Sequence, residues 1–166
     1  MSEPPILGID ASRGFTAEPT GTERYATEVA RRLARRPDFK TRLYFRQDPE
    51  GSVPNGTESR ILEAPRLWTH TRLALEVATK PPDLLFVPAH VLPVVTRPPS
   101  VVTVHDLGFL AHPEAHTAFQ RWYLDWTTHR HVHRAARIVA DSESTRADLV
   151  RAYHADPDRV DVVPLG

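Results

Sequence analysis

The sequence predicts an α/β protein with a Rossmann-like, doubly wound and mostly parallel sheet of about seven strands flanked by helices. Short apolar segments alternate with helical patterns along the whole chain of 166 residues, which is the order that βαβ units produce. The segments around Ile9 and Val104 are apolar instead of alternating with polar residues, as strands covered by helices on both faces must be. We find no repeat and no interdomain linker, so residues 1–166 are expected to form a single domain.

Each expected strand is a short run of apolar residues, many of them β-branched or aromatic. In chain order the strands cover residues 6–9, 43–45, 60–62, 84–87, 100–105, 137–140 and 160–163. The strands that contain Ile9 and Val104 are the most uniformly apolar, and we expect them to be central and adjacent.

The first expected helix begins after Thr20, where Thr20 and Glu23 form a capping-box pattern, and it ends near Arg36, before Pro37. The second covers residues 66–79. The third opens at Pro113, since proline is favoured in the first turn of a helix. The fourth runs from Ser142 to about His154.

Four aromatic residues of the third expected helix follow helical spacing and are assigned to the core instead of to a sugar-stacking platform. They are Phe119, Trp122, Tyr123 and Trp126.

Composition excludes several classes of protein. Basic and acidic residues number 21 each, so no field of one sign attracts nucleic acid, and the absence of cysteine excludes disulfides and thiolate metal sites. The first five residues lack the apolar core of a signal peptide, and the longest apolar stretch, residues 84–95, is too short to span a bilayer. We therefore expect a soluble, cytoplasmic protein.

The segment 100–109 carries the strongest functional signal. A buried strand ends there on His105 and Asp106, which a glycine, Gly108, soon follows. The carboxyl ends of parallel strands form the rim of the ligand crevice, so both side chains are candidates for that crevice. The structural alternative is a core-edge imidazole at His105 and a helix N-cap at Asp106.

Three further positions are candidates for binding. Gly21 and Thr22 open a helix after the first strand, where free backbone N–H groups can stabilise negative charge; an ordinary capped helix start is the alternative. Ser142 also begins a helix, and an N-cap is favoured over ligand contact.

His129 and His133 share a helix face, but without an acidic or cysteine partner nearby in the sequence we expect neither a metal nor a cofactor.

Several segments, in order, resemble the N-terminal half of retaining glycosyltransferases of family four, which have the two-domain GT-B architecture. Residues 6–11 resemble the "GIDA" strand, residues 20–25 the "TG-x-x-RY" turn, and residues 101–107 the "VVT-x-HDL" segment. Residues 141–149 resemble "VSE-x-TRxDL", and residues 158–166 resemble "xRI-x-VVPLG", which leads into the second domain. One departure is Glu23, where many members have glycine.

The resemblance implies the acceptor-side domain of a hexosyltransferase of polysaccharide biosynthesis. The donor, a nucleotide sugar, would be held mainly by a C-terminal domain absent from this chain, so that the chain alone would be inactive. His105 would hydrogen-bond a donor-sugar hydroxyl, and Asp106 would orient His105 or line the acceptor pocket. The acceptor would be a glycan, a lipid or a small molecule; in the lipid case the basic helix end 31–36 offers peripheral contact at the inner membrane face. The alternative function is a non-catalytic Rossmann-like binding module or a degenerate partner subunit.

Overall fold

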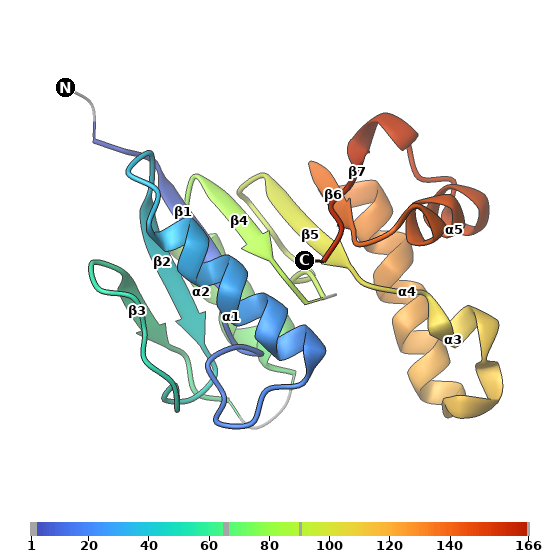
Figure 1. Ribbon diagram of the computed structural model, residues 1–166, viewed down its shortest axis with the longest axis horizontal. Coiled ribbons are helices and arrows are strands. Elements are labelled where there is room, and N and C mark those ends of the chain that lie inside the picture. The colour runs from blue at the N-terminus through green and yellow to red at the C-terminus, as the bar shows by residue number, and fades with distance from the viewer. Residues whose placement is uncertain (1–2, 65–66, 90, 166) are drawn as a thin grey trace.

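The computed structural model of the protein describes residues 3–64, 67–89 and 91–165. Figure 1 shows a single twisted sheet with helices packed against it. The sheet has seven strands in the order β3-β2-β1-β4-β5-β6-β7, and each neighbouring pair is parallel. The strands are β1 (Ile6–Asp10), β2 (Lys40–Phe45), β3 (Glu58–Ile61), β4 (Leu84–Val87), β5 (Ser100–Val104), β6 (Arg137–Ala140) and β7 (Val160–Val162). The predicted fold class is confirmed.

Two hydrophobic cores, one on each face, explain why the central strands are apolar throughout. Along β4, Phe86 packs into the core under helix α1 (Gly21–Ala34), whereas Leu85 and Val87 point to the opposite core. That second core also takes apolar residues from α2 (Ala74–Thr79), α4 (Ala118–Arg134) and α5 (Glu143–Tyr153). Helices on both faces leave only the strand ends open to ligands.

The expected adjacency of the strands at Ile9 and Val104 is wrong. Strand β4 lies between them, pairing with β1 through Leu7 and Leu84 and with β5 through Leu85 and Ser100. Uniform apolarity reports that a strand is covered on both faces, which holds for β1, β4 and β5 alike, and it carries no information about which strands are neighbours.

The helices differ from expectation mainly at their starts. The expected start of the second helix at residue 66 lies outside the described residues; within them, a π-helical turn, Thr69–Leu73, precedes α2. The third helix does not open at Pro113, which instead starts a 3₁₀ turn after the short helix α3 (Gly108–Ala111). Helix α4 begins after Thr117, whose hydroxyl accepts the Gln120 N–H at 3.2 Å while the Gln120 side chain accepts the Thr117 N–H at 2.9 Å. This reciprocal cap satisfies two free amides, which a proline cannot do.

The assignment of the aromatic row to the core is wrong for two of its four members. Phe119 is 70% and Trp122 59% exposed, while Tyr123 and Trp126 are half-buried. Figure 1 shows that the N-terminal part of α4 extends, together with α3, beyond the sheet. The residues of α4 that are buried, such as Thr128 and Val132, lie in its C-terminal half. No helix in the described part of the chain is long and apolar enough to cross a membrane.

Candidate functional site

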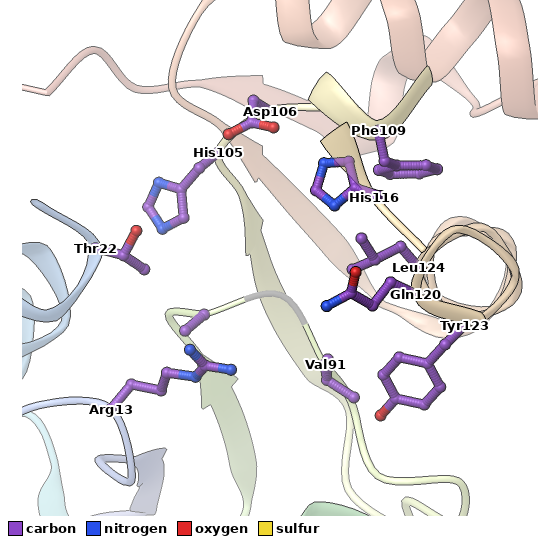
Figure 2. A pocket seen from close by; sticks show the side chains of 11 residues that line it. Arg13, Thr22, Val91, His105, Asp106, Phe109, His116, Gln120, Tyr123 and Leu124 are labelled. Carbon is purple, nitrogen blue, oxygen red and sulfur yellow. The ribbon is translucent and has the colours of Figure 1, made fainter. Parts of the chain in front are cut away.

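A cleft of about 580 Å³ opens at the carboxyl ends of the central strands (Figure 2). One wall comes from the loop after β1 and the first turn of α1, and the other from α4. The end of β5 and the loop after β4 connect the two walls. The lining residues are Arg13, Thr22, Ala89, Val91, His105, Asp106, Phe109, His116, Gln120, Tyr123 and Leu124. The sheet thus places its cleft where an open α/β fold binds ligands.

His105 lies at the rim with its ring held on three sides. Nε2 is 3.0 Å from the Pro88 carbonyl, which can only accept, so Nε2 carries a proton and donates. Nδ1 lies 3.5 Å from the Asp141 carboxylate. The ring meets the Tyr25 ring edge-on, with centroids 4.9 Å apart. Its side chain is only 14% exposed, so the imidazole has one orientation and is not a freely rotating surface group.

Thr145 links His105 to the start of α5. Its buried hydroxyl lies 3.0 Å from the His105 carbonyl and 3.2 Å from Asp141 Oδ1, and it donates to one of these acceptors. Ser142 Oγ lies 3.0 Å from the same hydroxyl and accepts the Thr145 N–H at 3.1 Å. Ser142 is therefore the N-cap of α5, the interpretation that the sequence favoured, and it does not line the cleft.

Asp106 lines the cleft but does not contact the ring of His105 through an ion pair. Its Oδ1 accepts the Gly108 N–H at 2.8 Å, which starts the turn into α3, and the side chain remains exposed. Of its two expected roles, lining the pocket fits this geometry, since Asp141 is the carboxylate that faces His105.

The first turn of α1 presents backbone N–H groups beside the cleft. Glu23 folds back and accepts the Thr20 N–H at 2.8 Å and the Thr20 hydroxyl at 2.9 Å, and the backbone bond in particular lowers the pKa of Glu23. Glu23 therefore caps the helix and leaves Gly21 and Thr22 exposed. A Cβ added at Gly21 would meet nothing within 4 Å, so nothing in the described fold requires glycine there.

The α4 wall carries a buried hydrogen bond behind its aromatic surface. The Tyr123 hydroxyl lies 2.8 Å from His70 Nε2, in the π-helical turn. Burial, together with the nearby Arg130, lowers the pKa of His70 and favours the neutral ring, which can share a hydrogen bond with the Tyr123 hydroxyl in either tautomer. The phenol of Tyr123 is thus fixed at the cleft instead of rotating into solvent.

The loop after β4 is held to α4 by two contacts. Buried His131 accepts the Leu92 N–H on Nε2 at 3.0 Å, and Arg130 donates to the Val94 carbonyl at 2.6 Å. With the contact from His105 to Pro88, these bonds fix the segment that contributes Ala89 and Val91 to the cleft.

His129 and His133 have ring centroids 4.5 Å apart on the exposed side of α4. Among the residues that the structure describes, no group of three histidine or acidic side chains could hold a metal ion.

Sequence reasoning placed His105, Asp106 and Thr22 at the cleft, but it missed Arg13, Gln120, Tyr123 and Asp141. Asp141 directly follows strand β6, at the same edge of the sheet as His105, so the same signal could have identified it. Arg13 and Tyr123 come from a loop and a helix that only the tertiary fold brings together.

A sequence model described as Glycosyltransferase Family 4 matches residues 19–166. A comparison with curated proteins finds no significant sequence match.

We describe two of the solved structures that share the fold. One is HepE from Anabaena, solved with UDP and glucose, with a TM-score of 0.62 and 15% identity. The other is the wall teichoic acid polymerase TagF, with a TM-score of 0.58 and 12% identity. The matches cover 97% and 98% of this chain but only 44% of HepE and 38% of TagF. The chain therefore spans less than half the length of either protein.

Proposed function

The chain belongs to Glycosyltransferase Family 4, and we propose that it forms the acceptor-side domain of a retaining hexosyltransferase. In this proposal the enzyme transfers a sugar from a nucleotide-diphosphate donor to a glycan, lipid or small-molecule acceptor in polysaccharide biosynthesis. The observation that carries the proposal is the cleft at the strand ends, with the fixed ring of His105 at its rim. We place the enzyme in the cytoplasm, with peripheral membrane contact if the acceptor is a lipid.

The partial coverage of HepE and TagF supports a division of labour between two domains. Here the present chain supplies one wall of the catalytic cleft and the acceptor surface. A second domain, packed over the strand ends, supplies most contacts to the nucleotide. His105 and the first turn of α1 then face the donor, because both lie at the open edge of the sheet.

The role of α1 follows from the charge that develops during the reaction. As the bond from sugar to diphosphate breaks, negative charge grows on the phosphate oxygens while the sugar becomes oxocarbenium-like. The N-terminus of this 14-residue helix carries partial positive charge and exposed N–H groups at Gly21 and Thr22. Such preorganised donors stabilise the transition state more than the ground state.

The role of His105 follows from its hydrogen bonds. Asp141 on Nδ1 and the edge of Tyr25 hold the ring, while Nε2–H donates to the Pro88 carbonyl. In the reaction a hydroxyl of the donor sugar also accepts from Nε2–H, which it then shares with the Pro88 carbonyl. The ring acts as a hydrogen-bond donor near the anomeric centre, and no proton needs to leave it.

The test is sugar transfer by the protein that contains this chain together with its donor-binding domain. We expect it to consume an α-configured donor such as UDP-glucose or GDP-mannose in the presence of acceptor and to form an α-linked product, seen by NMR. A β-linked product would refute retention, and no transfer from any nucleotide sugar would refute the proposal.

A further inference from the structure

We infer that the acceptor is an anionic sugar, bound with its phosphate or carboxylate on Arg13 and its ring against Tyr123. This inference rests on the proposed function and specifies the acceptor that the cleft takes. It starts from the one strongly cationic side chain in the cleft lining.

The positive charge of Arg13 acts to lower the pKa of the nearby carboxyl groups of Asp10 and Glu23, but no close contact with a described residue holds its guanidinium. Among the residues that the structure describes, its guanidinium makes no ion pair and no hydrogen bond, and the side chain is exposed. Figure 2 shows it pointing into the cleft from the loop after β1, away from Asp106. Asp106, the acidic residue of the lining, accepts the Gly108 N–H on Oδ1 and makes no ion pair with Arg13. A planar guanidinium in this state fits a phosphate or a carboxylate, which it can bind through two parallel hydrogen bonds.

Tyr123 and Gln120 face Arg13 from the opposite wall. Burial raises the pKa of the Tyr123 phenol, and the positive charge of Arg13 partly opposes that shift. Figure 2 shows the Gln120 amide directed into the same space.

The combination is specific for sugars among anions. The face of a tyrosine ring packs against the C–H groups of a pyranose, and a primary amide both donates to and accepts from hydroxyl groups. The His70 hydrogen bond holds the Tyr123 ring in place, so little conformational freedom is lost when a sugar binds. A cleft of about 580 Å³ accommodates one or two sugar rings.

The test is an NMR shift titration of this chain with four probes: glucose 1-phosphate, glucuronate, neutral glucose and UDP. We expect at least one anionic sugar to bind about tenfold more tightly than glucose, a typical value for one charge-assisted pair. Binding of glucose 1-phosphate alone identifies a phosphate-bearing acceptor, and binding of glucuronate alone a uronic acid.

Arg13→Gln should reduce the preference for the anionic sugar to less than about threefold. Because Arg13 is exposed and makes no ion pair or hydrogen bond among the described residues, the variant should fold normally. The matched control is Arg32→Gln, which removes an equal charge from an exposed position near the other end of α1, outside the cleft lining. It should leave the preference unchanged.

Three results would overturn the inference: no binding of either anionic sugar, an unchanged preference in Arg13→Gln, or Arg13-dependent binding of UDP alone, which would assign Arg13 to the donor. Failure here leaves the proposed function standing if sugar transfer is observed. Conversely, if an anionic sugar binds in an Arg13-dependent way but no sugar transfer is observed, the anionic-sugar site stands and the bound sugar is not an acceptor.

Discussion

Replacing Thr145 with valine tests the connection between His105 and helix α5. The residue is 5% exposed, and its hydroxyl oxygen lies 3.0–3.2 Å from the His105 carbonyl, Asp141 Oδ1 and Ser142 Oγ. Valine keeps the branched shape but leaves the acceptor of this hydroxyl, the His105 carbonyl or Asp141, without its donor, which costs about 1–3 kcal/mol. In a domain of this size that lowers Tm by about 2–4 °C for each kcal/mol.

The assay is urea unfolding followed by circular dichroism, with two comparison variants. Thr145→Ser retains the hydroxyl and should lose clearly less stability than Thr145→Val. Thr79→Val removes an exposed hydroxyl that bonds only to helix carbonyls, and it should cost less than about 0.5 kcal/mol. If Thr145→Val is no more destabilising than Thr79→Val, the inferred connection between β5 and α5 is incorrect.

Three other predictions concern charge and binding. Burial raises the pKa of Asp10 above its ordinary 3.8, so ionisation destabilises the fold as pH rises past that value. In urea unfolding, Asp10→Asn should therefore match the wild type near pH 3 and be at least as stable as the wild type at pH 7. A loss of stability above about 1 kcal/mol at pH 7 would show that the fold requires the carboxylate. Because the pKa of His70 is lowered from 6.5 in the folded protein, this histidine is protonated first in the unfolded chain as pH falls. The free energy of unfolding of the wild type should therefore drop from pH 7 toward pH 5. A His70→Gln variant whose free energy of unfolding falls equally steeply would contradict this. By calorimetry this chain alone should show no micromolar affinity for UDP-sugars or GDP-sugars, and such affinity would place the donor site within it.

The fold was predictable because the central strands are buried on both faces and are therefore apolar. Leu85 and Phe86 serve opposite cores, so β4 had to be apolar at every position. Strand order was not predictable in the same way, because it depends on which face each crossover connection takes. The start of α4 was misplaced because Pro113 was weighted above the Thr117–Gln120 pair, whose reciprocal bonds define the cap.

The site was predictable where a residue follows a strand directly, as at His105. It was not predictable where the fold joins distant segments, as with His105 and Asp141 or Arg13 and Tyr123. The aromatic row shows the limit of periodicity. Helical spacing places Phe119 and Trp122 on one side of α4. Their exposure follows from the length of α4, because its N-terminal part extends beyond the sheet and has no hydrophobic core to pack against.

The most direct test of the proposed function is His105→Ala in the protein that carries both domains. If His105 donates a hydrogen bond to the sugar where charge develops, the change should lower kcat more than it raises the donor KM. The expected loss is about 2–4 kcal/mol, on the order of a hundredfold in rate. The exposed His112→Ala serves as control and should retain full activity. Unchanged kcat with a lowered Tm would contradict the account, because His105 would then serve only to hold Pro88 and the loop after β4.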